Sequence, residues 1–197
     1  MEERMDTVYP YLVEAAAEAA RVAAGVGPDR LDAPSPCGEW DVRTLVNHWV
    51  LYGSHGLEHR ARRLRLPAAL TERDFTADED WAACYAAQLD RAVAAWAAPG
   101  TWDGSVDLGF AEQPAPEVAA LIWAELVLHG WDVAHATGQE FRVSDGAAAL
   151  LLHVVEKNAA IYRQYEGFAD PVEVPAGASV YERALARSGR DPLPVRS

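Results

Sequence analysis

Two residues of types that commonly bind metal ions, Glu125 and His129, lie four positions apart in the segment ELVLHGWDVAH. In a helix this spacing places both side chains on one face, one turn apart. The neighbouring residues in the predicted helix are apolar, among them Leu121, Leu128 and Val133. An ionised carboxylate on an apolar face is unfavourable by roughly several kcal/mol unless it is paired. A metal ion would provide that pairing; a surface Glu–His pair, or a buried glutamate bonded to an arginine, is the simpler alternative.

A third ligand has to come from another helix, and His48 is the best candidate. Its neighbours in a helix, such as Leu45 and Leu51, are mostly apolar, so His48 is expected to face the core. A single inward histidine can equally be a hydrogen-bonded core residue, but helical bundles build metal sites from inward residues on facing helices. Two imidazoles and one carboxylate commonly bind zinc and leave a fourth position open. The same set also suits non-heme iron(II).

His55 and His59 form the main alternative pair, because they too have the spacing of two ligands on one helix face. His59 is close to several arginines, which indicate a solvated end and disfavour a second cation. Asp132 lies three residues after His129 and is placed to orient that imidazole. His135 is also explained as a histidine that the dipole at a helix C-terminus stabilises.

Cys37 lies just before Asp41, a residue type that favours the start of a helix. A thiol near a helix N-terminus can have a lowered pKa and be reactive. The alternative is a buried, unreactive thiol in a Pro-rich loop. The sequence contains no Gly-rich phosphate loop, no G-x-S-x-G and no C-x-x-C. It therefore assigns no catalytic residue and no cofactor-binding residue beyond the candidate metal ligands.

Long helices must position these side chains. Alanine is frequent and is the best helix former. Apolar residues also recur at spacings of three and four, as in Trp81, Tyr85, Leu89, Val93 and Trp96. Together with capping residues and Gly or Pro stops, the pattern predicts five helices, over residues 10–24, 41–64, 78–97, 116–137 and 144–165. A further short helix is expected over 179–188, after an extended piece at 171–175.

The segment between the third and fourth predicted helices, residues 99–116, is rich in glycine and proline. A loop of this length in a compact domain often has a function, and we expect it to border the site. Trp102 and Phe110 either wall a pocket there or merely cover the end of the bundle. The alternation in residues 105–108 indicates that part of the segment could instead be a short strand.

Composition limits the class of protein. The chain has 197 residues, of which 50% are hydrophobic, which is enough for one sizeable core. Its formal net charge of −13 disfavours binding to nucleic acid or to an anionic membrane surface. No apolar run is long enough to span a membrane, the N-terminus lacks the pattern of a signal peptide, and two cysteines form no disulfide framework. We expect a cytoplasmic all-α protein, with a helical bundle over 1–165 and an extension over 166–197 packed on it.

Two motifs resemble a known family. The segment PSPCGEWDVRTLVNHWV resembles the opening of the mycothiol-dependent maleylpyruvate isomerase N-terminal domain, with a Pro-Cys loop, a Trp, a Val-Arg pair and a core His. The segment ELVLHGWDVAHATGQ resembles the matching motif on the fourth helix, a carboxylate four residues before H-G-W-D. In this order, over about residues 5–165, they resemble the DinB-like superfamily of metal-binding four-helix bundles.

The resemblance implies one divalent metal ion, usually zinc, between the second and fourth helices. By position, it implies His48, Glu125 and His129 as the ligands. It also implies a low-molecular-weight thiol, such as mycothiol or bacillithiol, as a cosubstrate. The isomerase has a further C-terminal α/β domain that helps to complete its active site, whereas only residues 166–197 follow the fifth predicted helix here. Maleylpyruvate isomerisation itself is therefore not expected.

The expected function is that of a zinc-dependent enzyme that activates a low-molecular-weight thiol for transfer or isomerisation. Its partners would be a small thiol and an electrophile, and a homodimer is left open. Two other functions also stay open: a metal-binding or sensor module without turnover, and a hydrolase that uses metal-activated water.

Overall fold

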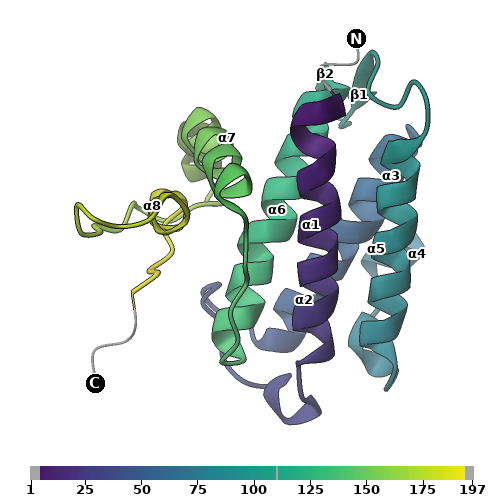
Figure 1. Ribbon diagram of the computed structural model, residues 1–197. Coiled ribbons are helices and arrows are strands. Elements are labelled where there is room, and N and C mark those ends of the chain that lie inside the picture. The colour runs from purple at the N-terminus through teal and green to yellow at the C-terminus, as the bar shows by residue number, and fades with distance from the viewer. Residues whose placement is uncertain (1–4, 110, 194–197) are drawn as a thin grey trace. The chain divides into compact units, whose positions relative to one another are not determined.

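The computed structural model describes residues 5–109 and 111–193. The chain divides into two compact units, residues 1–142 and 143–197. The four main helices of the first unit form an all-α bundle (Figure 1), which confirms the predicted fold class. They are α1 (Met5–Ala24), the continuous run α2 (Val42–Val50), η3 (Leu51–Gly56) and α3 (Leu57–Ala61), α5 (Trp81–Ala97), and α6 (Ala115–Ala136).

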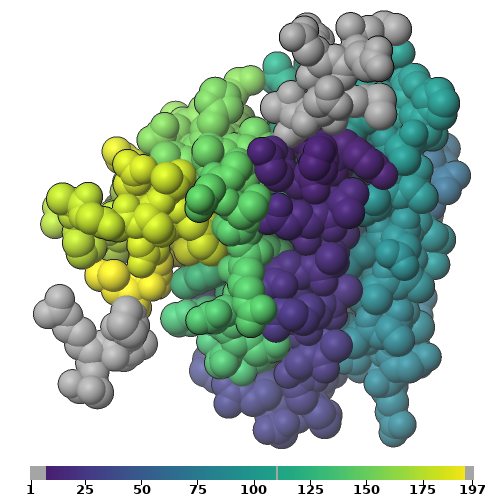
Figure 2. All heavy atoms as spheres, viewed as in Figure 1, coloured from purple at the N-terminus to yellow at the C-terminus, as the bar shows by residue number. Residues whose placement is uncertain are grey.

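In the bundle α1 packs against both α5 and α6, and α2 packs against α6. Figure 2 shows α1, in purple, lying along the teal α5 on one face of the unit. Short elements connect the main helices. They are the 3-10 turns η2 (Pro28–Arg30) and η4 (Phe75–Ala77), and α4 (Ala68–Thr71).

Three tryptophans at the centre of the bundle are completely buried: Trp49, Trp96 and Trp123. Each indole N–H is satisfied by a backbone carbonyl of another helix. The acceptors are Leu126 at 2.9 Å, Leu57 at 2.9 Å and Tyr11 at 3.0 Å. A buried donor without a partner is costly, so these hydrogen bonds fix how the helices lie along one another. The indole rings themselves fill the core.

The second predicted helix, 41–64, contains a change of helix type. Asp41 caps it as expected, its side chain accepting a hydrogen bond from the backbone N–H of Thr44 at 2.8 Å. Residues Leu51–Gly56 then form a π-helical segment, η3, whereas the sequence predicted a continuous α-helix. Inside it the Ser54 hydroxyl donates to the Val50 carbonyl at 2.6 Å. The helix ends earlier than predicted, at Ala61, and Arg63 follows with φ of 58°.

The segment before α6 contains the short strand that the sequence left open. β1 (Ser105–Asp107) pairs antiparallel with β2 (Glu112–Pro114). Trp102 is buried, donates to the Trp96 carbonyl at 2.8 Å and packs on the rings of Trp96 and Tyr9. These contacts match the simpler reading, in which Trp102 covers the core of the bundle. Phe110 lies outside the described residues.

The second unit contains α7 (Asp145–Gln164), which packs on α8 (Val180–Arg187). Ser144 caps α7, and Ser179 with Glu182 forms a capping box on α8. Residues 171–175, predicted to be extended, form neither helix nor strand, and the Val172 N–H donates to the Ala186 carbonyl at 3.0 Å. The fifth predicted helix thus groups with the C-terminal segment, so the division at 142 differs from the boundary expected at 165.

None of the helices in the described residues is long and apolar enough to cross a membrane.

Candidate metal centre

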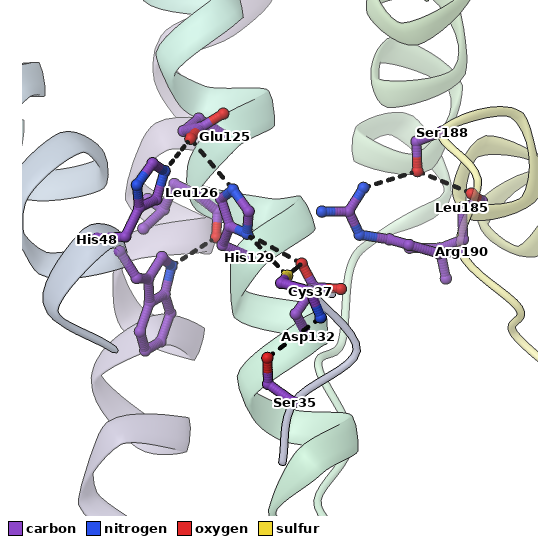
Figure 3. Close-up of polar contacts among 11 residues, drawn as sticks. Ser35, Cys37, His48, Glu125, Leu126, His129, Asp132, Leu185, Ser188 and Arg190 are labelled. Atoms are coloured by element: carbon purple, nitrogen blue, oxygen red, sulfur yellow. Dashed lines mark hydrogen bonds and ion pairs between the residues drawn. The ribbon is translucent and has the colours of Figure 1, made fainter. Parts of the chain in front are cut away.

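The three predicted ligands lie together in the first unit (Figure 3). One carboxylate oxygen, Oε1 of Glu125, is 2.8 Å from Nε2 of His48 and 3.2 Å from Nε2 of His129. The donor atoms of all three side chains lie within 4.8 Å of one another. Two imidazole nitrogens and a carboxylate oxygen therefore point at a common space.

Close packing of two helices creates this arrangement. His48 is in the last turn of α2, while Glu125 and His129 are one turn apart on α6. The bond from the Trp49 indole to the Leu126 carbonyl aligns α2 with α6. At Gly53 the helices approach so closely that a Cβ atom would lie 3.2 Å from Cδ1 of Leu126. A side chain there would require the Leu126 side chain to shift.

The three candidate ligands are only partly buried. The exposed fractions of the side chains are 25% for His48, 26% for Glu125 and 15% for His129. A zinc site with a structural role is usually closed by four protein ligands, whereas a catalytic site keeps one position for water or substrate. Three half-buried donors correspond to the second type.

The acid–base state of the site follows from its burial and its contacts. Burial disfavours the charged form of Glu125, but the charge and hydrogen bond of His129, together with the bond to His48, outweigh it and lower the pKa of Glu125. Burial likewise opposes the charged form of His129, yet the charge of Glu125 and the hydrogen bond to Asp132 raise its pKa well above the ordinary value. Without a metal, the pair is therefore carboxylate and imidazolium.

Asp132 contacts His129 as the sequence predicted. Its Oδ2 is 2.9 Å from Nδ1 of His129, and the Asp132 side chain is only 1% exposed. Histidines that bind metals usually donate their other ring N–H to a carboxylate or carbonyl, which fixes the tautomer and the orientation of the ring. With Nδ1–H held by Asp132, the nitrogen of His129 that is free to bind an ion is Nε2.

Cys37 lies at the Nδ1 edge of the His129 ring, a placement that the sequence did not predict. Its Sγ is 3.2 Å from Oδ2 of Asp132 and 3.8 Å from Nδ1 of His129. Burial raises the pKa of the Cys37 thiol, the hydrogen bond with His129 lowers it, and the charge of Asp132 raises it again, with a net upward shift. The idea of a thiol activated by a helix N-terminus is therefore wrong, because burial and a neighbouring carboxylate dominate.

Two aromatic side chains flank His48, and their role at the site was also missed. The ring of Trp40 is centred 4.9 Å from the His48 ring and 6.5 Å from that of His129. The ring of Tyr52, which is 42% exposed, is 4.7 Å from His48. Trp40 belongs to the same motif as Cys37. Tyr52 lies four residues after His48, and this spacing could have predicted that the two rings share one helix face.

The alternative histidine pair does not converge on a ligand space. Nδ1 of His59 is 2.8 Å from the backbone carbonyl of His55, and the two ring centres are 6.5 Å apart. His55 stacks on Phe75, with ring centres 5.2 Å apart. Within the described residues, neither belongs to a group of three side chains placed to hold an ion. His135 likewise stacks on Trp131, at 4.7 Å.

The fold and the site thus define a class of protein, the DinB-like four-helix bundles with two histidines and a carboxylate on facing helices. Residues 12–134 match the mycothiol maleylpyruvate isomerase N-terminal domain, and the chain belongs to that family. The match covers α2, α6 as far as residue 134, and all three candidate ligands.

Two uncharacterized proteins, from two strains of Mycobacterium tuberculosis, are each 31% identical to this chain over 120 residues. The aligned part is 61% of this chain and 62% of each relative. No solved structure matches the chain.

Proposed function

We propose that His48, Glu125 and His129 bind one divalent metal ion, with zinc as the expected metal, and that the protein uses it to activate a low-molecular-weight thiol of the mycothiol type for transfer or isomerisation. The observation that carries this proposal is the convergence of two Nε2 atoms on one carboxylate oxygen in a partly buried site. Membership of the mycothiol-related family supports the choice of thiol.

The residues present fit such an ion. The donor set is one that zinc accepts. The three donor atoms lie within 4.8 Å of one another, so a single ion can reach all of them after small adjustments. The Glu125 carboxylate would balance part of the charge of the ion. Without a metal, His129 carries a proton at Nε2, and this proton would leave when an ion binds. The proton at Nδ1 would stay on the ring, because it is hydrogen-bonded to Asp132.

A bound divalent ion supplies Lewis acidity, which keeps a sulfur or oxygen ligand deprotonated near neutral pH. The protein's own residues do the rest. Asp132 holds the His129 ring through its hydrogen bond to Nδ1, and the rings of Trp40 and Tyr52 lie beside the His48 ring. The thiol would lose its proton to solvent, and the thiolate sulfur would form a bond to an electrophile beside these rings. In a transfer the leaving group would depart with the electron pair of the broken bond, and in an isomerisation the thiolate would be expelled again after rotation about the former double bond.

The metal assignment is tested by elemental analysis of protein purified without added metal. About one divalent ion per chain is expected, as for a single three-ligand site. His129→Ala should abolish retention. A His55→Ala, His59→Ala double variant is the matched control and should keep the ion. Full retention of the ion in a His48→Ala, Glu125→Ala, His129→Ala triple variant would contradict the assignment.

Thiol activation is tested separately with the cobalt-substituted protein. Sulfur ligation produces a charge-transfer band, so adding mycothiol, bacillithiol or a simpler thiol should change the spectrum. A spectrum that no thiol changes contradicts thiol activation. Turnover of an ester or amide without thiol would then identify a hydrolase, and metal binding without any turnover would identify a binding or sensor module.

A further inference from the structure

Cys37 contacts the candidate centre from the side that faces away from the ion. The thiol is 3.8 Å from Nδ1 of His129, whereas Nε2 of the same ring faces Glu125. Figure 3 shows the sulfur beside Asp132 and the Nδ1 edge of the ring, with His48 and Glu125 at the other edge. Cys37 is therefore placed to act on His129 and not on a molecule bound at the open position.

Asp132 connects the thiol to the imidazole. One oxygen, Oδ2, accepts both the His129 N–H at 2.9 Å and the Cys37 S–H at 3.2 Å. The side chain is 1% exposed, and a buried carboxylate needs such partners. In this contact the thiol S–H is the donor and the carboxylate oxygen is the acceptor, so Cys37 contributes a hydrogen bond to Asp132.

The loop that carries Cys37 is held in place by its own hydrogen bonds. Ser35 N–H donates to the Trp40 carbonyl at 3.1 Å, and Trp40 N–H donates to the Cys37 carbonyl at 3.2 Å. The Cys37 N–H donates to the Ser35 hydroxyl at 3.1 Å, and residues 34 and 41 form an isolated β-bridge. The same loop presents Trp40 to both histidine rings. The thiol is thus presented to α6 from a well-bonded turn.

We propose that Cys37 is a positioning residue of the metal site, whose thiol holds Asp132 in the orientation that fixes His129 for the ion. This inference rests on the proposed metal function and assigns a role to a cysteine that the thiol chemistry does not use. Cys37 acts through Asp132, so its removal weakens metal binding only while Asp132 is present.

The first test measures zinc affinity by competition with a chromophoric chelator. Cys37→Ala and Cys37→Val both remove the donor, and Val better preserves the apolar volume. Each should weaken zinc binding by up to roughly 10-fold, the lower end of the range for a direct partner of a metal ligand, because Cys37 acts through Asp132. Cys37→Ser keeps a donor and should retain most of the affinity. Cys84→Ala, which removes the exposed thiol on α5, is the matched control and should bind zinc like the parent.

The second test separates this role from a general effect on folding. In a double-mutant cycle, Cys37→Val is combined with Asp132→Ala, and metal-free unfolding free energies are measured alongside zinc affinity. If the thiol acts through Asp132, Cys37→Val adds almost no further loss of affinity to Asp132→Ala. Losses that add fully, or losses that merely follow the unfolding free energy, overturn the proposal.

The outcomes also distinguish this inference from the proposed function. A parent protein that binds zinc, together with Cys37→Ala and Cys37→Val variants of unchanged affinity, overturns the role of Cys37 and leaves the metal site standing. A parent protein that binds no divalent ion overturns both.

Discussion

His129 uses both ring nitrogens, and Asp132 determines which one is available to an ion. The Nδ1–H to Oδ2 contact at 2.9 Å keeps Nε2 facing Glu125 and His48. Spacing along α6 placed both acidic residues near His129, but burial gives them different roles. Glu125 is 26% exposed and lies beside Nε2 of His129, where an ion would bind. Asp132 is 1% exposed and contacts the opposite edge of the ring, at Nδ1.

Replacing Asp132 by Asn is expected to weaken zinc binding by roughly 10-fold, at the lower end of the range for such partners. The amide oxygen can still accept from Nδ1–H, but the charge that makes the imidazole a stronger donor to the metal is lost. Chelator competition measures the effect. The exposed ion pair between Arg142 and Glu140 offers a control, because Glu140→Gln also removes one negative charge from the same unit. Equal losses in both variants would show that only net charge matters.

His55 gives the protein a pH dependence that is independent of the metal ligands. Burial, followed by the charge of His59, lowers the pKa of His55 from 6.5 to about 4. Above pH 6.5 the side chain is neutral whether the chain is folded or not. As pH falls from 6.5 towards about 4, the unfolded chain binds the proton first, so the folded state loses stability across that window.

His55→Gln is therefore expected to lose less stability than the parent between pH 7 and pH 4.5. The difference should be about 1–3 kcal/mol, because one unit of pKa difference corresponds to about 1.4 kcal/mol. Urea unfolding of metal-free protein at the two pH values measures it. Parallel losses in parent and variant would show that His55 titrates normally in the folded protein.

At the scale of elements, Gly130 explains why a glycine follows His129 in the middle of α6. A Cβ atom there would overlap the ring of Phe141, with Cδ2 at 2.7 Å, and Phe141 is buried. The glycine thus lets residues after the helix return across it. The cost in helix propensity is about 1 kcal/mol relative to alanine.

Gly130→Ala tests which effect dominates. Propensity alone predicts a gain of about 1 kcal/mol, but forcing a methyl group against a buried ring costs typically 1–3 kcal/mol. We expect a net loss of roughly 1 kcal/mol in the free energy of unfolding, and partial recovery in the Gly130→Ala, Phe141→Leu double variant. A more stable single variant would show that the Phe141 ring moves aside freely.

At the scale of the whole molecule, the first unit contains all three candidate ligands together with Asp132 and Cys37. Residues 1–142 hold α2, α6 and the Cys37 loop. The metal site should therefore not need the second unit. A chain that ends at residue 142 is expected to fold as a helical domain and to retain about one divalent ion, as is also expected of the full chain.

Circular dichroism and elemental analysis of that shortened chain measure both expectations. The same truncation with His129→Ala is the control and should fold without binding metal. If the shortened chain is helical but has lost the ion, the second unit contributes to the site. If it does not fold, the bundle depends on residues 143–197 and the boundary expected at 165 becomes the better description.

Much of this protein follows from local sequence rules. The helices were predictable because apolar spacing and caps such as Asp41 and Ser144 act within a few residues. The three candidate ligands were predictable for the same reason: each lies among apolar neighbours on its own helix, and helix faces depend on spacing alone. The interaction of Asp132 with His129 is also local, within one turn of α6.

Other features depend on residues that are distant in the chain. The change to π-helix at Leu51–Gly56 leaves no pattern of spacing by which it could be read. The contact of Cys37 with Asp132 joins positions 95 residues apart. Burial, together with the charge of that carboxylate, raises the pKa of the thiol, which decides for the buried alternative over the reactive one. Such contacts depend on how helices and loops pack, because the free energy that selects them comes from burial and pairing across the fold.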